Sequence, residues 1–553
     1  MPHLKSIKSH LQLIVMKSHF KSLLFLTSIL SLSFQLYAQQ SEKPNILFIA
    51  VDDLKPILGC YGDSIIKTPN IDRLAKMGSV FMSNYCQQAV CGPTRASLMT
   101  GKRPDYTKVW DLKTPMRDMN PDILSIPQYF ASQGYSSQGI GKVYDPRDVD
   151  KDLDKPSWSV PYYKTDSKYY DSKFGEPAAM RYQKPETKSI FKKYFDEATA
   201  QGMKKSEANE YALKKIKPAT ECIEVPDNAY NDGANALQAK DILISLSKKS
   251  NPFFFAVGFA KPHLPFIAPK KYWDLYQREK MPIAPFQESA KNSIDVAYHN
   301  AGEIRAYTDI EPLSTFSETK EFGITLPLEK QKELIHGYYA AISYTDAQVG
   351  ILLNTLDSLG LTNNTIIVLW GDHGWHLGDH NLWCKHTNFE QATKTPMIIS
   401  APGFSANSTS AQTEFVDIFP TLCDLAKLKI PANLDGLSLM PLMKNPTTTV
   451  KEFSVSQYPR SGKDPESERL GYASSKVMGY SLRTKKYRYT IWMKNDFRST
   501  DHYDEKLIIG EELYDYEADP LETINVFNEA KYKSTGEELK NKMISFFKSQ
   551  ETK

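Results

Sequence analysis

Three continuous runs of mainly apolar residues most constrain the fold of this 553-residue chain: residues 45–51, 253–258 and 365–370. Their apolar residues follow one another without the alternation that marks a half-exposed strand. Such runs are typical of strands that are buried on both faces, as in a parallel sheet. Helices are predicted between them, among them 234–247 and 330–359. Strands that alternate with helices predict an α/β fold, with a large and mostly parallel sheet flanked by helices.

Acidic residues follow two of these runs directly. Asp52 and Asp53 come after the first run, and Asp372 and His373 come after the third. Ligands of α/β folds bind at the carboxyl ends of the strands, and adjacent carboxylates are costly there unless a cation holds them. Oxygen ligands suit Ca²⁺ or Mg²⁺, and Ca²⁺ tolerates irregular geometry better. We therefore expect a Ca²⁺ site, with Mg²⁺ less favoured. The alternative is that Asp52 and Asp53 are turn and N-cap residues.

A second, smaller folding unit is predicted at the C-terminus. Residues 444–449 read Lys-Asn-Pro-Thr-Thr-Thr, which is the composition of a linker. Beyond them, 477–492 and 512–516 are predicted as antiparallel strands and 530–548 as a closing helix. We expect the domains to be a catalytic domain at 39–446 and a C-terminal α+β subdomain with an antiparallel sheet at 447–553.

The N-terminus resembles an export signal. Residues 1–38 are predicted as a signal peptide, in which 16–21 are basic and the following apolar stretch is too short for a membrane span. Residues 1–15 are either an upstream extension or part of a long basic segment. No cysteine follows the apolar stretch closely, so we expect no lipid or membrane anchor and a periplasmic or secreted protein. The net charge of +3 gives no indication of nucleic-acid binding.

The segment Cys91-Gly92-Pro93-Thr94-Arg95 combines a reactive side chain with a helix start. Pro93 suits the first turn of a helix because it has no N–H to leave unpaired. A group at a helix N-terminus faces unpaired amides and the positive end of the dipole, which favour an anion. The alternative is a buried cysteine beside a chance proline and arginine. Cys86 is near enough to raise the question of a disulfide, which would remove the Cys91 thiol.

Three basic segments add charge that would suit an anionic ester. They contain Lys142 in Gly141-Lys142-Val143-Tyr144, His263 in Lys261-Pro262-His263-Leu264-Pro265-Phe266, and Lys385 in Trp383-Cys384-Lys385. Preorganised cations stabilise charge that develops in a transition state, and a histidine can donate a proton to a departing alcohol. Taken one at a time, each residue is more simply explained as a surface lysine or a core histidine.

The pattern C-x-P-x-R with a glycine six residues later resembles the type I sulfatases, and further stretches are similar to the iduronate-2-sulfatase branch. The resemblance covers residues 43–530, except that 146–220, an expected insertion, and the irregular 276–325 match poorly. It implies an alkaline-phosphatase-like sulfatase fold. It also implies that Cys91 is oxidised to formylglycine (3-oxoalanine) by a formylglycine-generating enzyme and that a cation binds a set of five residues: Asp52, Asp53, Cys91, Asp372 and His373.

The resemblance also implies roles for the basic residues and a substrate class. Oxidised Cys91 would attack the sulfur with Arg95 beside it, Lys142 and Lys385 would bind the sulfuryl oxygens, and His263 would protonate the leaving group. The substrate would be a sulfated polysaccharide or its oligosaccharides, such as a uronic-acid-containing glycosaminoglycan or ulvan. Further candidate substrate contacts are Arg460, Arg483, His376 and His380. One position departs from the family: Asp145 stands where a histidine is expected, and we assign it no catalytic role.

Two alternatives stay open at this point. One is a phosphoester or phosphonate monoester hydrolase on the same fold, although its relatives usually have Ser or Thr at the position of Cys91. The other is a non-catalytic protein that binds sulfated glycans. The set of Cys91, Arg95, Lys142, His263 and Lys385 favours a sulfatase over both.

Overall fold

The computed structural model describes residues 43–311, 323–461, 476–494 and 503–551. The predicted signal peptide lies outside these residues and stays a prediction. The chain divides into Met1–Pro44 and Asn45–Lys553, and the second unit contains every element considered below. Within the described ranges, no helix is both long and apolar enough to cross a membrane.

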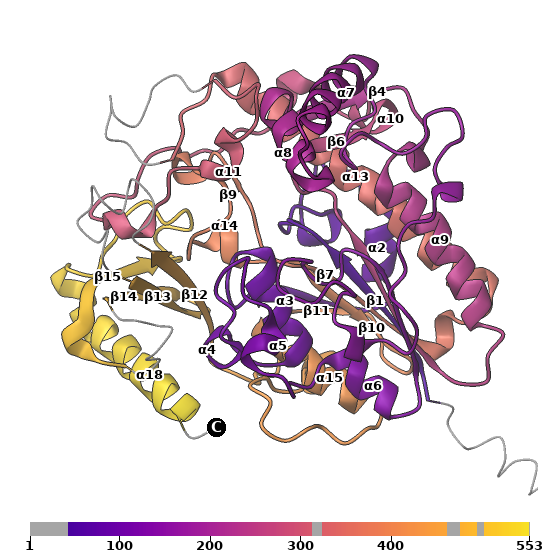
Figure 1. The fold of residues 1–553 in the computed structure, drawn as a ribbon. Coiled ribbons are helices and arrows are strands. Elements are labelled where there is room, and N and C mark those ends of the chain that lie inside the picture. Colours follow the sequence, from indigo (N-terminus) through magenta and orange to yellow (C-terminus); the bar gives the residue numbers. More distant parts are fainter. Residues whose placement is uncertain (1–42, 312–322, 462–475, 495–502, 552–553) are drawn as a thin grey trace, which may run out of the picture. The chain divides into compact units, whose positions relative to one another are not determined.

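The larger sheet forms the centre of this unit (Figure 1). In the described part of the chain it has seven strands, in the order β11-β2-β10-β7-β1-β5-β3. Neighbouring strands are parallel except at β10, which is antiparallel to both β7 and β2. The apolar runs form the central strands β7, β1 and β5, so the predicted, mostly parallel sheet is confirmed. The strands are β1 Asn45–Val51, β2 Ser79–Tyr85, β3 Ser136–Gly141, β5 Phe253–Phe259, β7 Thr365–Gly371, β10 Met397–Ser400 and β11 Asn407–Glu414.

Helices cover both faces of this sheet, which explains why β1 is apolar throughout. Successive residues of a strand point to opposite faces: Leu47 and Ile49 belong to one core, and Ile46 and Phe48 to the other. Each such buried side chain contributes about 1.5–3 kcal/mol. The first face is covered by α2 Pro69–Ala75, α9 Asn231–Leu246 and α13 Leu328–Ser358, and the second by α3 Cys91–Thr100, α6 Ile126–Ser132 and α15 Ile418–Leu425 (Figure 1).

The register of the central strands brings the predicted acidic residues together. Val51 of β1 pairs with Gly371 of β7, so the two strands end at the same level. Asp52 and Asp372 follow at once, and the Asp372 N–H donates to the Val51 carbonyl at 3.2 Å. Asp53 then adopts a left-handed conformation with φ of 57°, which turns the chain out of the strand. The carboxylates thus lie side by side at the carboxyl edge of the sheet.

The expected insertion is partly helical, as predicted. It contains α7 Pro185–Ala200 and α8 Lys205–Lys215, followed by β4 Thr220–Ile223, which pairs with β6 Phe266–Pro269. Shorter elements connect the larger ones: α4 Pro104–Thr107, α5 Met116–Met119, α10 Lys270–Trp273, α11 Gly302–Arg305, α14 Glu390–Thr393, α16 Met440–Lys444, β8 His376–Leu377 and β9 Trp383–Cys384.

The C-terminal part forms the predicted antiparallel sheet with a helix packed on it (Figure 1). Its order is β12-β13-β14-β15, with every pair antiparallel. Leu539 and Met543 of the helix share a core with Met478 and Tyr480 of the sheet. The predicted domain boundary at 446/447 precedes this sheet and stays a prediction. The elements are β12 Phe453–Ser461, β13 Lys476–Thr484, β14 Tyr487–Lys494, β15 Ile508–Asp515 and α18 Lys533–Glu551.

Candidate active site

Three carboxylates meet at the carboxyl edge of the larger sheet. Asp52 and Asp53 follow β1, Asp372 follows β7, and all three are fully buried. The Asp53 N–H donates to Asp372 Oδ1 at 2.8 Å, which fixes the two strand ends relative to each other. Buried carboxylates without counter-charges are strongly destabilising. The cations around them therefore matter to the fold as well as to any reaction.

Arg95 is the buried counter-ion of two of these carboxylates. Its Nη2 lies 3.0 Å from both Asp52 Oδ1 and Asp372 Oδ2, and its Nε donates to Asp372 Oδ2 at 3.1 Å. Burial alone would raise the pKa of Asp52, but the positive charges of Lys142 and Arg95 lower it well below its usual value. Asp52 is therefore ionised throughout the neutral pH range.

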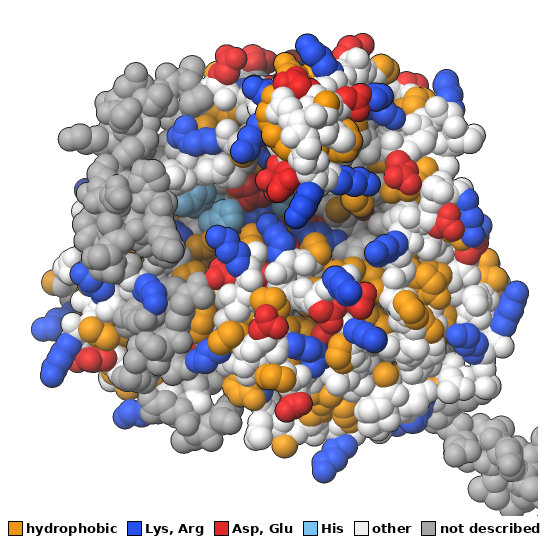
Figure 2. Space-filling view, viewed as in Figure 1, with side chains coloured by type: hydrophobic (Ala, Val, Ile, Leu, Met, Phe, Trp, Pro, Cys, Tyr) orange, Lys and Arg blue, Asp and Glu red, His pale blue; other side chains and the backbone are white. Residues whose placement is uncertain are grey.

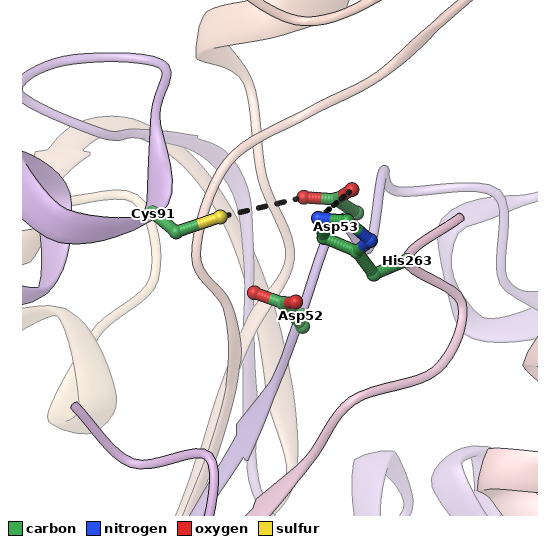
Figure 3. A group of neighbouring side chains, drawn as sticks. All are labelled: Asp52, Asp53, Cys91 and His263. Atoms are coloured by element: carbon green, nitrogen blue, oxygen red, sulfur yellow. Dashed lines mark hydrogen bonds and ion pairs between the residues drawn. The ribbon is translucent and has the colours of Figure 1, made fainter. Parts of the chain in front are cut away.

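Cys91 begins α3, and its thiol faces the carboxylates (Figure 3). The sulfur lies 3.8 Å from Asp53 Oδ1 and 3.5 Å from His373 Nε2. Burial, followed by the negative charge of Asp52, raises the pKa of the Cys91 thiol well above its usual value. Because the thiolate is the nucleophilic form, an unmodified Cys91 is a poor nucleophile at neutral pH. Cys86 and Cys91 are both free, so the disulfide considered from the sequence is not formed.

Two lysines that are far apart in the sequence reach the same carboxylates. Lys142 follows β3, and its Nζ lies 2.5 Å from Asp52 Oδ2. Lys385 follows β9, and its Nζ lies 3.1 Å from both oxygens of Asp53. The Lys385 ammonium also lies 4.8 Å from the centre of the Trp375 ring. The structure thus places both predicted lysines at the group of carboxylates.

Two histidines also face Asp53. His263 Nε2 lies 3.7 Å from Asp53 Oδ2, and His373 Nε2 lies 3.3 Å from Asp53 Oδ1 (Figure 3 shows the first of these). The His263 Nδ1 lies 2.6 Å from the Leu264 carbonyl, which can only accept, so Nδ1 carries a proton and Nε2 faces the site. Burial, with the positive charge of Lys385 beside it, lowers the pKa of His263 well below its usual value.

Glu303 of α11 is a site residue that the sequence did not predict. Its Oε1 lies 3.0 Å from Lys385 Nζ and 3.4 Å from His263 Nε2. Burial would raise the pKa of Glu303, but the charge of Lys385 and the hydrogen bond from its ammonium lower it to about 2. The residue lies in the 276–325 segment, which has no regular pattern. A single glutamate in such a segment carries no signal that distinguishes it from a surface residue.

The donors assembled here suit a hard divalent cation. Burial, together with the charges of Asp52, Glu303 and Asp372, raises the pKa of Asp53 well above its usual value in spite of Lys385. A cation bound by the carboxylate oxygens would relieve that repulsion, and such oxygens are the ligands that Ca²⁺ and Mg²⁺ prefer. Two overlapping groups have ligand atoms within 4.8 Å of one another: Asp52, Asp53, Cys91 and His263, and Asp53, Cys91, Asp372 and His373. The residues therefore fit the expected metal.

Asp145, which departs from the family pattern, holds an arginine beside the site. Its two oxygens accept hydrogen bonds from Nε and Nη2 of Arg147, each at 2.8 Å. Its Oδ2 also lies 3.9 Å from Lys142 Nζ. Burial would raise the pKa of Asp145, but the bonds from Arg147 and the charge of Lys142 lower it. An ionised Asp145 thus balances part of the local positive charge.

The two arginines expected to contact substrate are engaged elsewhere. The Arg483 Nε donates to Glu390 Oε2 at 3.0 Å, and its guanidinium lies 3.5 Å from the centre of the Tyr516 ring. Arg460 donates to three backbone carbonyls, those of Val296, Ala297 and His386, at 2.9–3.0 Å. These contacts hold backbone segments and ion pairs in place, and the expected substrate contacts at Arg460 and Arg483 stay predictions.

His376 and His380 also have contacts within the fold. His376 is fully buried, and its Nε2 lies 2.9 Å from the Thr387 hydroxyl. His380 Nε2 lies 3.1 Å from the Glu522 carbonyl, and its ring stacks on Phe389 at 4.5 Å between centres. These contacts fit a role in the fold, and a substrate contact at either histidine stays a prediction.

Comparison with known proteins decides the family. Residues 44–428 match the Sulfatase family, and residues 378–549 match the C-terminal region of N-sulphoglucosamine sulphohydrolase. The chain belongs to the sulfatase family. This sulfatase is 33% identical over 537 residues to iduronate 2-sulfatase of Homo sapiens, with 88% of this chain and 91% of the relative covered. It is 30% identical over 517 residues to a sulfatase of Formosa agariphila, with 91% and 86% covered.

A solved structure agrees with the fold of the sulfatase described here. A protein in complex with its substrate D-glucosamine-2-N,6-O-disulfate aligns with a TM-score of 0.64 at 20% identity, and the alignment covers 92% of this chain and 98% of that one. The sulfatase family, the sulfatase fold and the activity class of sulfuric ester hydrolase, all predicted from the sequence, are confirmed.

Proposed function

We propose that this sulfatase removes sulfate from a sulfated polysaccharide or its oligosaccharides, such as a uronic-acid-containing glycosaminoglycan or ulvan. The observation that carries the proposal is the position of Cys91. Its side chain begins a helix and faces buried carboxylates, with the cations Lys142 and Lys385 beside them. The names of the relatives, which refer to sulfates of iduronate and glucosamine, support a carbohydrate substrate.

Two groups would complete the site. Cys91 oxidised to formylglycine would supply the nucleophile, and Ca²⁺ would draw electron density from the sulfate oxygens. Asp52, Asp53, Asp372 and His373 are the residues that would hold the cation, next to Cys91. Because Cys91 is only 1% exposed, we expect the formylglycine-generating enzyme to act before the chain has folded.

The cations of the chain would bind the ester and stabilise charge. Lys142 and Lys385 would lie against the sulfuryl oxygens, where fixed positive charge lowers the energy of the transition state. Arg95 would keep Asp52 and Asp372 ionised and in place, as it does in the structure. These assignments use cations that already lie within 3.1 Å of the carboxylates.

His263 would protonate the leaving sugar oxygen. Its Nε2 faces the site but is unprotonated at neutral pH, because burial and Lys385 lower the pKa of His263. A negatively charged ester placed beside this ring favours its charged form. Binding of the anionic ester would thus favour uptake of a proton from solvent at Nε2, and His263 would then donate this proton to the leaving oxygen.

The proposal is tested by the mass of the peptide that contains Cys91 together with sulfate release. We expect protein made with a formylglycine-generating enzyme to show the mass of a CHO group in place of CH₂SH and to release sulfate from sulfated oligosaccharides. Cys91→Ala should abolish release. Cys86→Ala, a nearby buried cysteine whose sulfur contacts the Ala392 carbonyl at 4.0 Å, is the matched control and should keep it.

Other outcomes would favour the alternatives. Full turnover by Cys91→Ala would contradict the proposal. An unmodified protein that cleaves aryl phosphates or phosphonates faster than aryl sulfates would indicate a phosphoester or phosphonate hydrolase. Fully oxidised protein that retains sulfated glycans without releasing sulfate would indicate a glycan-binding protein.

A further inference from the structure

A cavity of about 720 Å³ borders the active site. Asp52, Lys142 and His263 form part of its wall, and residues of the 162–181 segment form another part. Figure 2 shows a hollow beneath the α7–α8 region, in which histidine, basic and acidic side chains gather. A substrate whose ester lies at Cys91 would extend into this space.

Most acidic groups that line the cavity already have partners. Asp52 pairs with Lys142 at 2.5 Å, and Asp145 forms two hydrogen bonds of 2.8 Å with Arg147. Asp232 accepts hydrogen bonds from two backbone N–H groups at 3.0 and 2.7 Å. The charges of Asp52 and Asp145 are therefore balanced by a lysine and an arginine, whereas Asp232 is held by backbone groups alone.

Two cations of the lining have no such partner. The guanidinium of the half-buried Arg181 makes no hydrogen bond or ion pair with any residue that the structure describes, and neither does the ammonium of the exposed Lys164. Over the same ranges, the lining carboxylates without a cation partner are Asp232 and Glu176. Lys261 also lines the cavity, and its ammonium donates to the carbonyls of His263 and Pro265 rather than to a carboxylate. In the described lining, three cations without an acidic partner thus stand against two carboxylates without a cation, so the unpaired charge of the cavity is positive.

The cavity also presents aromatic rings that are fixed in place. The Tyr162 hydroxyl donates to the Gly141 carbonyl at 2.8 Å, and the Tyr170 hydroxyl donates to Asn231 Oδ1 at 2.7 Å. Both rings line the cavity. Each ring is fixed by the backbone at one end and by its hydroxyl at the other, so it offers a flat apolar face at little entropic cost. Apolar surfaces with a few polar groups are typical of ligand sites.

We propose that Arg181 binds a second anionic group of the substrate, either a uronate carboxylate or a second sulfate, while the ester to be cleaved lies at Cys91. The inference rests on the proposed function. Both anions offer paired oxygens that match the two parallel N–H groups of a guanidinium. Arg181 would thereby select charged sugars over neutral ones and would act on binding rather than on the chemical step.

Kinetics of Arg181→Gln test this with three substrates: a sulfated aryl uronide, its analogue with the carboxylate reduced to hydroxymethyl, and D-glucosamine-2-N,6-O-disulfate. Hydrogen bonds to a charged group contribute enough that we expect KM to rise about 10- to 100-fold for substrates with a second anion. We expect kcat to change little, and the reduced analogue to be unaffected. The control is Arg278→Gln, an exposed arginine outside the cavity.

Calorimetry on the Cys91→Ala protein measures binding of the same compounds without turnover. Weaker binding of the uronide alone after Arg181→Gln assigns the site to a carboxylate, and weaker binding of the disulfate alone assigns it to sulfate. Three outcomes overturn the inference: Arg181→Gln weakens binding of all three compounds equally, it weakens binding of none, or none of the compounds binds before the substitution is made. If the fully oxidised protein with its native sequence released no sulfate while binding still depended on Arg181, the proposed function would be contradicted and this inference would stand.

Discussion

Arg95 is the residue on which both the fold and the site depend most directly. It is fully buried, and its guanidinium stacks 5.2 Å from the centre of the Trp370 ring. Its nitrogens contact Asp52 and Asp372 and donate to the Val143 carbonyl at 2.9 Å. One planar group thus satisfies acceptors of four residues, Asp52, Asp372, Lys142 and Val143, whereas an ammonium has only three N–H groups.

We therefore expect Arg95→Lys to be severely destabilising although it keeps the charge. At least one buried carboxylate or carbonyl would lose its donor, which costs about 3–5 kcal/mol for a broken buried ion pair. Urea unfolding and sulfate release measure the two effects, and both should be lost together. The matched control is Arg73→Lys, an exposed pair with Asp357 at 3.4 Å, which should change stability by less than about 1 kcal/mol. An Arg95→Lys protein as stable as this control would refute the argument.

At the scale of elements, the sequence predicts the strands and helices that carry a regular apolar pattern and does not predict those that lack one. The strands β1, β5 and β7 and the helices α9 and α13 were predicted because apolar patterns of six or more residues mark them. The strand β11 was not, because it lies at the edge of the sheet, has a bulge and reads Asn-Ser-Thr-Ser-Ala-Gln-Thr-Glu. The strand β2 lies inside the sheet and reads Ser-Val-Phe-Met-Ser-Asn-Tyr, and it was not predicted because Ser83 and Asn84 interrupt its short apolar run.

The same distinction holds for the site. Asp52 and Asp372 could be predicted because strand ends meet at one edge of a parallel sheet. Glu303 could not, since it is brought in by a four-residue helix within an irregular segment. The partners of Arg483 could not be predicted either, because Glu390 and Tyr516 come close only once both sheets are packed. Contacts between distant segments leave no local pattern.

The close approach of β3 and β5 depends on two glycines. Gly141 pairs with Gly258, and Gly141 has a φ of 77°. A Cβ on Gly258 would lie 2.1 Å from the carbonyl carbon and 2.2 Å from the carbonyl oxygen of Lys142. The absence of a side chain at this position therefore sets where Lys142 leaves the sheet to reach Asp52.

We expect Gly258→Ala to displace the Lys142 backbone and reduce sulfate release at least tenfold, with a loss of about 1–3 kcal/mol in unfolding free energy from the strain. Activity assays and urea unfolding check both values. Gly536→Ala in α18 is the control, because its Cβ would meet Phe527 at an ordinary 3.4 Å and alanine favours a helix by roughly 1 kcal/mol. Unchanged activity of Gly258→Ala would show that the backbone there can shift at no functional cost.

At the scale of the whole molecule, charged residues join the C-terminal sheet to the segment beside the active site. Arg488 of β14 donates to Glu390 at 2.6 Å and to Glu522 at 2.8 Å, and Arg483 of β13 shares Glu390. Burial would raise the pKa of Glu390, but Arg483 and Arg488 lower it well below its usual value. The ion pairs of Glu390 stabilise the folded protein at any pH above the pKa that the Glu390 carboxyl has in the unfolded chain. Their contribution is lost as the pH falls from that pKa toward the lower pKa of the folded state.

A second buried carboxyl of the C-terminal sheet has the opposite effect on stability. Glu512 of β15 accepts hydrogen bonds from Trp492 Nε1 and the Tyr514 hydroxyl, each at 2.9 Å, and has no cation within the described residues as an ion-pair partner. Burial raises its pKa to about 7, although those hydrogen bonds lower it. In the unfolded chain the carboxyl ionises near its ordinary pKa of 4.5. The folded state therefore holds a proton that the unfolded state has lost between these two pH values.

Linkage then fixes the sign of the pH dependence. The contribution of Glu512 is fully present below pH 4.5 and is lost as the pH rises through about 7. Glu512→Gln cannot ionise, so its stability relative to wild type should improve by about 3 kcal/mol between pH 4.5 and pH 8. Urea unfolding of both proteins across that range measures this difference. Glu537→Gln, at an exposed position of α18, shows what the same substitution does at the surface. If the difference between wild type and Glu512→Gln were flat with pH, Glu512 would have to be ionised in both states or protonated in both, and the burial argument would fail.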